Sequence, residues 1–311
     1  MTKIIKAVRP FFNNDSDFKI PLYEEWMKLG GRSVPFRKYE KYYRGLSFHI
    51  NFPTLYTNKH EARLRFVEGA TLLFDTFPDY LCYEVIPVIW DCWPTYFDKV
   101  ARFFKKHNVR TAFFTSSQTA SRMKEVYPEK NIFHLPEAIN TCLYKKGKPL
   151  AERSIDYLEY GRCSKVIDST TLDKDISVLS SRTNFRALIG TKRLTEALSD
   201  SKITLAMTRQ DNQPELAQGI DTLTQRYWEC MLSGVVLLGR SPQELIDIIG
   251  YDPVVKLDRE HVKEQIQDML NHISDYQELV NRNRESALQY GDWSSRVKEM
   301  RERLLECGYR I

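Results

Sequence analysis

Four polar side chains lie close together between Gly219 and Gly239, and their types suit one kind of ligand. Asp221 and Thr224 precede a short helical run, and Arg226 and Glu229 lie within it. The amino end of a helix carries unpaired N–H groups and a positive dipole, so it favours a phosphate. A guanidinium offers a planar fork to phosphate oxygens, and a carboxylate accepts hydrogen bonds from sugar hydroxyls. Together these groups fit a nucleotide diphosphate-sugar, although an ordinary connection with surface charges has the same composition.

A helix and a strand would position these side chains. The run from Arg226 to Leu232 should end at Gly234, because glycine takes the left-handed conformation without strain. Val235 to Leu238 is uncharged and β-branched in part, which is typical of a buried parallel strand. Ser241 is expected to cap the next helix, with Pro242 at its first position. The order loop, helix, strand, helix indicates an α/β sheet.

The composition is that of a globular chain with two medium-sized cores. The chain has 311 residues, 42% of them hydrophobic, and a net charge of +5, which does not by itself indicate a nucleic-acid partner. The cysteines form no C-x-x-C pair and the histidines no metal-binding spacing, so we expect a reducing cytosol, no metal and no bound cofactor. No signal peptide and no apolar run of about eighteen residues is visible, so the expected location is cytoplasmic, at most peripheral to the membrane.

The first part of the chain alternates between strands and helices. Predicted strands cover 3–8, 70–74, 85–90, 110–114 and 131–135, and predicted helices cover 18–29, 60–68, 94–106 and 117–127. This alternation predicts a parallel sheet, which binds ligands beyond the carboxyl ends of its strands. Asp91 follows the best of these strands, so we predict an acceptor-side base or orienting residue there. The alternative is an Asp that caps the helix beginning at Pro94.

A polar, basic segment from Thr141 to Arg153 is a linker by composition. The pattern then restarts with predicted strands over 154–159, 178–179, 202–207 and 253–257, and predicted helices over 259–272, 273–290 and 294–306. We therefore predict an α/β protein of two Rossmann-like, doubly wound domains, residues 1–150 and 151–293, facing each other across a cleft. Arg209 follows the strand over 202–207 and would border the base or the phosphates of a nucleotide.

Three stretches, in order, resemble the retaining GT-B glycosyltransferases of the group one or family-four type. They are Phe113 to Asn140, Tyr157 to Arg162, and the stretch from Gly219 to Gly239. Asp221 and Glu229 are eight positions apart, the spacing of the family's two acidic residues, and Thr224-x-Arg226-x-x-Glu229 is similar to the CgeB-type variant. The resemblance covers residues 110–300. The first acidic residue is Asp where the family has Glu, and the glycine-rich loop after the first strand is missing.

The resemblance implies a GT-B fold and a donor site in the second domain. The implied donor-binding residues are Gly161, Arg162, Lys165, Arg209, Asp221, Thr224, Arg226 and Glu229. Glu229 would hold the ribose hydroxyls, Arg226 and Thr224 would face the diphosphate, and Asp221 would contact the sugar. The alternatives without a function are a solvated helix glutamate for Glu229 and a loop aspartate in an Asx-turn for Asp221. The family also implies that the last helix, 294–311, packs back on the first domain.

The implied reaction moves a sugar from a nucleotide diphosphate-sugar to a glycan or lipid-linked acceptor, with retention and without a metal. A lipid-linked acceptor would add a peripheral contact with the inner membrane face, and no nucleic acid is expected as a partner. A nucleotide-sugar epimerase of the same architecture is a second enzymatic reading, and it would act on the donor alone. A non-enzymatic basic α/β module is a third, and it would not need Glu229.

Overall fold

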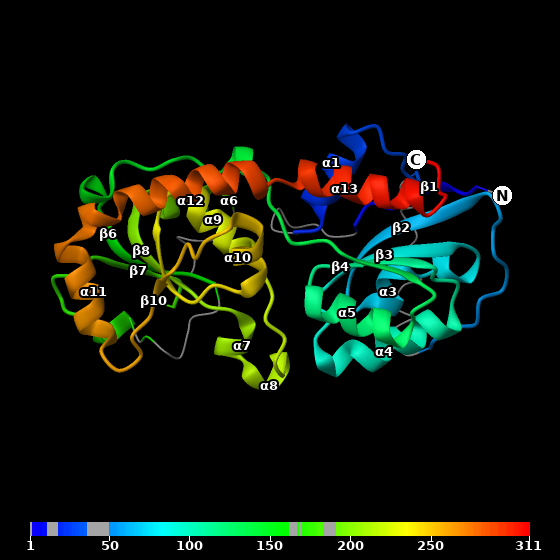
Figure 1. Cartoon of the computed structure of the whole chain (residues 1–311), viewed down its shortest axis with the longest axis horizontal. Helices are drawn as coiled ribbons and strands as arrows, with labels where there is room; N and C mark the ends of the chain where they lie inside the picture. Colours follow the sequence, from blue (N-terminus) through cyan, green and yellow to red (C-terminus); the bar gives the residue numbers. More distant parts are fainter. Residues whose placement is uncertain (1, 11–17, 36–49, 162–166, 168, 183–190) are drawn as a thin grey trace. The chain divides into compact units, whose positions relative to one another are not determined.

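The computed structural model describes residues 2–10, 18–35, 50–161, 167, 169–182 and 191–311. By contacts, the chain forms two compact units (Figure 1). The first unit contains residues 1–136, 215–222 and 293–311, and the second contains 137–214 and 223–292. Each unit is a parallel α/β sheet with helices, so the predicted fold class is confirmed. The domain limits at residues 150 and 293 stay a prediction.

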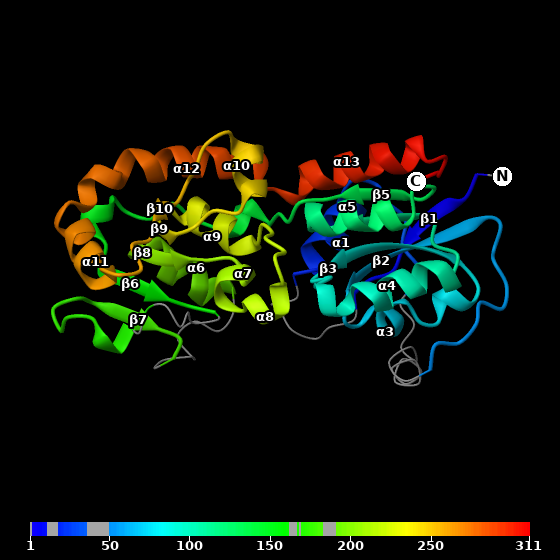
Figure 2. The same cartoon turned by 60° about the horizontal axis from the view of Figure 1, so that its bottom comes forward.

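The first sheet contains five parallel strands in chain order (Figure 2). The strands are β1 (Ile4–Ala7), β2 (Glu61–Glu68), β3 (Glu84–Trp90), β4 (Thr111–Phe114) and β5 (Asn131–His134). The accompanying helices are α1 (Ile20–Lys28), α3 (Leu72–Thr76), the 3-10 turn η2 (Asp79–Leu81), α4 (Pro94–Lys106), α5 (Ser117–Val126) and α13 (Trp293–Glu306). Ser116 caps α5, because its hydroxyl accepts a hydrogen bond from the amide of Thr119.

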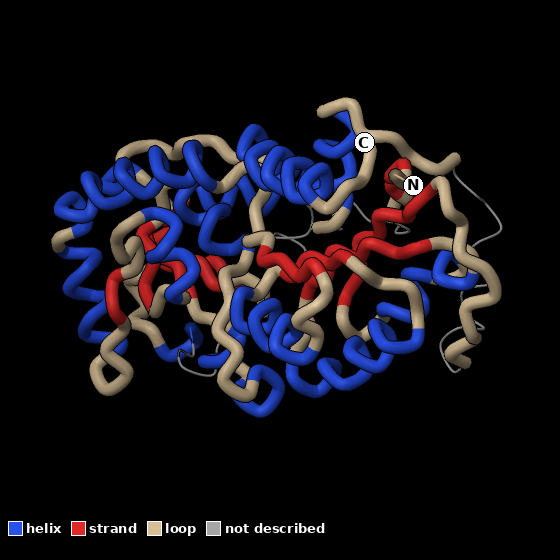
Figure 3. Tube along the Cα trace, turned by 45° about the vertical axis from the view of Figure 1, so that its right-hand side comes forward, coloured by secondary structure: helices blue, strands red, loops and turns tan. Residues whose placement is uncertain are grey.

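Helices cover both faces of this sheet, as its fully buried β3 requires (Figure 3). Val85 and Ile89 point to one face and share a core with Leu72 of α3 and Phe103 of α4. Trp90 points to the other face, where its ring lies 6.1 Å from that of Trp293 at the start of α13. Helix α13 also packs against α1. The last helix is therefore part of the core of the first unit.

Two predicted elements in this unit are wrong. Residues 60–68 were expected to be helical and form the strand β2, while residues 70–74 were expected to be a strand and contribute to α3. The sequence of β2, EARLRFVE, is made of good helix formers, but strands on both sides of it impose the extended form. Its Arg63 and Arg65 are buried beside Asp79, at 3.8 Å and 3.1 Å, and Arg63 also pairs with Glu61 at 2.9 Å. No local pattern predicts the contacts with Asp79.

The second sheet also has five parallel strands, in the order β10-β9-β8-β6-β7. The strands are β6 (Ile155–Glu159), β7 (Val178–Ser180), β8 (Ser201–Ala206), β9 (Val236–Gly239) and β10 (Val255–Lys256). The helices are α6 (Thr191–Ser199), α7 (Arg209–Asn212), α9 (Gln225–Ser233), α10 (Gln243–Ile249), α11 (Val262–Asn271) and α12 (Gln277–Tyr290). From β6 the chain adds β7 on one side and then β8 on the other. This reversal is a topological switch point, where sheets of this kind bind ligands.

The predicted order of loop, helix, strand and helix around α9 is confirmed. Gly234 ends α9 in the left-handed conformation, with a φ of 66°. Helix α9 is nearly fully buried through Trp228 and Met231, which share a core with α12. The prediction that Ser241 caps α10 is wrong. Its hydroxyl donates to Asp252 at 2.7 Å instead. Pro242 holds the cap position instead.

The outer edge of β1 is covered by segments far away in the sequence. Ile5 donates its amide to the carbonyl of Arg310 at 2.8 Å, and Arg310 donates to Lys3 at 2.8 Å. At the other end of the strand, Ala7 donates to Arg32 at 2.8 Å. The C-terminal residues therefore complete the first sheet. Within the described ranges, no helix is both long and apolar enough to cross a bilayer.

Candidate functional site

The switch point of the second sheet brings two of the predicted residues together. Gly161 directly follows the end of β6 and has a φ of 71°, a conformation that favours glycine. A Cβ atom at this position would lie 2.2 Å from Nη2 of Arg226 on α9. Gly161 is therefore needed for two reasons, its backbone conformation and the close approach of the guanidinium.

Arg226 is a buried cation whose hydrogen-bond partner is a neutral carbonyl. Its Nη2 donates to the carbonyl of Tyr160 at 2.9 Å, and its guanidinium lies 4.5 Å from the centre of the Tyr160 ring. Burial opposes its charge, but interactions with Tyr160, Cys230 and Glu229 raise the pKa of Arg226. Among the residues that the structure describes, no carboxylate forms an ion pair with it. Such a guanidinium, with donors left over, suits an anionic ligand.

Glu229 lies one helical turn further along α9 and is held by neutral groups. The hydroxyl of Tyr144 donates to its Oε1 at 2.9 Å, and the hydroxyl of Tyr160 donates to its Oε2 at 3.1 Å. Burial raises the pKa of Glu229. Burial also raises the pKa values of both tyrosines, so their hydroxyls remain donors. A carboxylate that accepts from two hydroxyls can accept from two hydroxyls of a sugar in the same way.

Sequence reasoning missed both tyrosines. Tyr144 lies in the segment interpreted as a linker, and its side chain is buried. That segment is fixed by Thr141, whose hydroxyl donates to Asp292 at 2.7 Å. Tyr160 lies in the stretch from Tyr157 to Arg162, where the resemblance implies a role for Gly161 and Arg162 alone. The one available signal was the presence of two tyrosines close to an otherwise polar stretch, which is too common to predict a contact.

The amino end of α9 already holds an anion. Thr224 occupies the cap position, but its hydroxyl makes no capping hydrogen bond. The amide of Gln225 donates instead to the Oε2 of Glu137 at 3.1 Å. The carbonyl of Glu137 also accepts from the indole of Trp228 at 2.8 Å. The predicted preference of this helix end for negative charge is thus met by a carboxylate of the chain.

The other predicted donor residues lie in different places. Arg209 is the first residue of α7, at the carboxyl end of β8 beside the switch point, and its guanidinium donates to Gln213. Asp221 belongs by contacts to the first unit, where its amide donates to the Oε1 of Gln118 at 2.6 Å. Arg162 and Lys165 lie outside the described residues.

Asp91, the predicted acceptor-side residue, directly follows β3 in the first unit. Its φ of 48° is unusual for a residue other than glycine, although aspartate tolerates it better than most. Residues held in such conformations cluster at functional sites. The neighbouring Cys92 is buried, which raises its pKa to about 12 and leaves an inert thiol.

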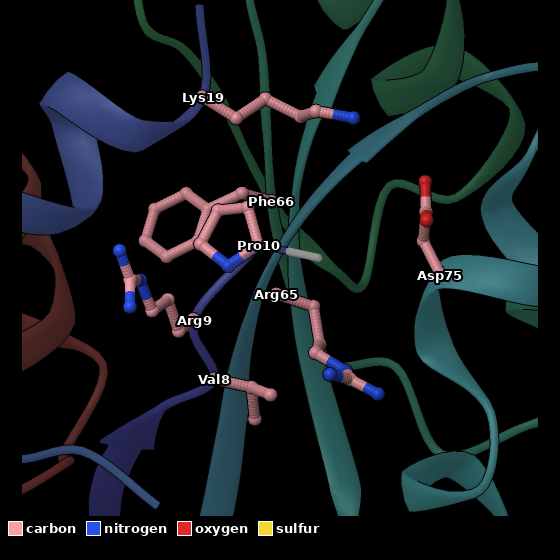
Figure 4. A pocket seen from close by; sticks show the side chains of 7 residues that line it. All are labelled: Val8, Arg9, Pro10, Lys19, Arg65, Phe66 and Asp75. Carbon is pink, nitrogen blue, oxygen red and sulfur yellow. The ribbon is translucent and has the colours of Figure 1, made fainter. Parts of the chain in front are cut away.

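A second polar pocket lies at the carboxyl ends of β1 and β2, around Lys19, Arg65 and Asp75 (Figure 4). Its free volume is about 10 Å³, room for about one water molecule. Two of its three cations are paired within the fold, since Lys19 lies 3.1 Å from Glu68 and Arg65 lies 3.1 Å from Asp79, and the third is Arg9. This pocket is too small for a substrate. Across the described ranges, no three His, Cys, Asp or Glu side chains gather as a metal site.

The fold is similar to that of solved glycosyltransferase structures. Sucrose-phosphate synthase from Thermosynechococcus elongatus has a TM-score of 0.59 at 9% identity, over 98% of this chain and 99% of that one. HepE from Anabaena in complex with UDP and glucose has a TM-score of 0.61 at 7% identity, over 98% and 100% of the two chains. HepE in complex with UDP-glucose has a TM-score of 0.58 at 7% identity, with the same coverage. At these identities the likeness shows the fold.

Residues 163–302 match the family model described as glycosyl transferase-like. The chain has the fold of the GT-B glycosyltransferases, and the family match covers 140 of its 311 residues. The matched range contains α9 with Arg226 and Glu229, so the family assignment and the switch point converge on one part of the enzyme. The resemblance inferred from sequence is confirmed, and its CgeB-like variant stays a prediction. No curated protein matches this chain.

Proposed function

We propose that the enzyme transfers a sugar from a nucleoside diphosphate-sugar to a glycan or lipid-linked acceptor, with retention and without a metal. One observation carries the donor assignment: the guanidinium of Arg226 and the carboxylate of Glu229 lie at the switch point with partners that are all neutral. A diphosphate supplies the negative charge that Arg226 lacks. A ribose supplies hydroxyls of the kind that Glu229 already accepts.

Each part of the donor then has a defined neighbour. The diphosphate lies against Arg226 and the start of α9, where it competes with the carboxylate of Glu137 for the amide of Gln225. The ribose lies against Glu229 and displaces the hydroxyl of Tyr144 or Tyr160. UDP is the first nucleotide to test, because HepE, which has a similar fold, was solved with UDP and glucose. Arg226 and the dipole of α9 would neutralise the leaving diphosphate in place of a metal ion.

Asp91 and Asp221 are proposed for the acceptor and for the transferred sugar, respectively. Both follow strand or loop positions at the carboxyl side of the first sheet, the side on which parallel sheets bind ligands. Retention rests on the family resemblance. Nuclear magnetic resonance of the product anomer formed from an α-linked donor tests it directly: a β-linked first product contradicts retention.

Calorimetry with UDP and uridine tests the donor site. Arg226→Ala should weaken UDP binding by about ten- to a hundredfold and change uridine binding little, since only UDP carries phosphates. Glu229→Ala should weaken both ligands by a similar factor, since both carry the ribose. Lys192→Ala and Glu196→Ala, which remove the same charges from exposed positions on α6, are the matched controls. Unchanged binding of both ligands to both site variants would falsify the donor assignment.

Two further measurements complete the test. Thermal shifts with UDP, GDP, ADP, CMP and TDP rank the bases, because a ligand that binds the folded state raises its melting temperature. Repeating the UDP titration with a chelator, and then with added Mg²⁺ or Mn²⁺, tests metal independence. A loss of affinity that the metal restores contradicts it.

A further inference from the structure

Helix α4 of the first unit carries four cations that line one hollow. Lys99, Arg102, Lys105 and Lys106 surround it together with Asn51 and Leu73, and its volume is about 610 Å³. In the described part of the chain none of these four cations forms an ion pair with a carboxylate. Lys99 donates to the carbonyl of Ala70 at 2.8 Å, and Lys106 donates to the carbonyl of Asn51. Carbonyl partners orient the ammonium groups and leave their charges uncompensated.

Exposed apolar side chains lie beside these cations. Ile50, Leu55 and Tyr56 are 51%, 73% and 58% exposed, and no other segment of the described chain exposes three large hydrophobic residues so close together. The backbone of this segment is fixed, because the amides of Leu55 and Tyr56 both donate to the carbonyl of Leu81 at 2.8 and 3.1 Å. The exposure of these side chains is therefore a property of an anchored segment.

The apolar segment and the end of α4 are joined by polar contacts. Nε2 of His107, directly after α4, lies 2.7 Å from Oδ1 of Asn51, and its Nδ1 lies 2.9 Å from the hydroxyl of Thr54. Asn51 also lines the hollow between the cations. The apolar segment is therefore held against the end of the helix that carries the cations. We call this set of residues the α4 surface: Lys99, Arg102, Lys105, Lys106, Ile50, Leu55 and Tyr56.

We propose that the α4 surface docks the enzyme on an anionic lipid membrane. The cations attract acidic headgroups, at about fivefold in affinity for each Lys or Arg near the surface. The aliphatic stems of the lysines and Leu73 give the hollow an apolar floor, and such stems lie at the boundary between headgroups and acyl chains. Leu55 and Tyr56 provide apolar and interfacial anchors. A nucleic-acid backbone would use the cations but would leave the apolar side chains in water, so lipid is favoured.

Docking does not depend on the proposed donor chemistry, and its test needs no nucleotide. The whole enzyme is sedimented with vesicles of phosphatidylcholine alone and with vesicles that also contain phosphatidylglycerol. Binding is expected only to the acidic vesicles, and raised salt should weaken it. Arg102→Gln with Lys105→Gln should lower the affinity by about twenty-five-fold. Lys263→Gln with Lys298→Gln, exposed cations on α11 and α13, should leave it unchanged.

The apolar part is tested separately. Leu55→Ser with Tyr56→Ser should lower binding to acidic vesicles by about tenfold, while Leu288→Ser with Leu305→Ser, which are also exposed, should not. Equal binding to neutral and acidic vesicles, or no binding to either, would overturn the proposal. So would binding to double-stranded DNA with the same dependence on Arg102 and Lys105 and no vesicle binding, which would assign the surface to a nucleic acid. Unchanged melting temperatures of all variants keep the comparison free of folding effects.

Discussion

Two buried glutamates, one in each unit, have opposite kinds of partner. In the first unit, Glu84 lies 2.6 Å from the ammonium of Lys3 and 2.9 Å from Nε of Arg110. Burial opposes its ionisation, yet the hydrogen bonds from Lys3, Tyr309 and Arg110 lower the pKa of Glu84. In the second unit, Glu229 accepts only from tyrosine hydroxyls, and burial raises its pKa.

This difference separates a structural carboxylate from one that is available to a ligand. A hydroxyl of a ligand can replace a tyrosine hydroxyl without any change in buried charge. A ligand that displaced Lys3 or Arg110 from Glu84 would leave charges unpaired, which costs far more. The kind of partner depends on where the carboxylate lies within its unit and not on which unit contains it. Glu159 on β6 is also buried in the second unit, yet it pairs with Arg182 at 2.9 Å. Among these three carboxylates, Glu229 is the one suited to recognition.

The largest effect is expected where buried charges are paired. Asp79→Ala removes the counter-charge of Arg65 and the more distant of two counter-charges of Arg63, and both arginine side chains are 3% exposed. We expect the free energy of unfolding to fall by about 3–5 kcal/mol, measured by urea titration. Asp98→Ala, an exposed position on α4, is the control and should change it by less than about 0.5 kcal/mol. A cost for Asp79→Ala as small as that of the control would break the distinction between structural and available carboxylates.

A smaller effect extends the comparison to a base with neutral partners. His107 is buried between Thr54 and Asn51, and burial together with Lys106 lowers its pKa from 6.5 to about 4. Since the folded-state pKa is depressed, the stabilisation is present above pH 6.5 and is lost as the pH falls towards 4. The loss should reach at most about 3 kcal/mol.

Urea titrations between neutral pH and pH 4 measure this loss. His107→Gln should flatten the dependence, and His272→Gln, an exposed position, should not. Glu84 contributes in a different range, because its lowered pKa removes stability only below the ordinary carboxyl value of 4.5. If the free energy of unfolding fell with pH equally in the parent and in His107→Gln, the neutral partners would not fix the protonation state of His107.

The smallest effect concerns the hydroxyl that a ribose would replace. Tyr144→Phe removes one of the two donors to Glu229 and should lower the free energy of unfolding by about 1–3 kcal/mol without ligand. Uridine should restore part of this loss, so its thermal shift should be larger for the variant than for the parent. Tyr251→Phe is the matched control, because its hydroxyl donates to the neutral Asn283 at 2.9 Å in the same unit. Equal shifts with uridine and 2′,3′-dideoxyuridine would contradict a ribose contact.

The fold was predictable where local sequence and tertiary structure agree. The apolar run Val85 to Trp90 of β3 and the end of α9 at Gly234 both follow from their own residues. Strand β2 was not predictable, because its buried Arg65 depends on a carboxylate distant in the sequence, Asp79, and its flanking strands decide the extended form. For the site, the sequence indicated Arg226, Glu229 and Gly161. It could not indicate Tyr144, whose hydroxyl reaches a carboxylate 85 positions away.

The closure of β1 by the C-terminal residues has a consequence for the life of the newly made chain. A strand at the edge of a sheet presents unpaired N–H and C=O groups to any other strand that it meets. In the finished enzyme Arg310 and Arg32 occupy this edge of β1. While the polypeptide is still on the ribosome, Arg310 has not been made, and the edge beside Ile5 remains open to other nascent chains. The segment at Arg310, which is synthesised long after Ile5, thus covers the edge at which β1 could pair with another chain.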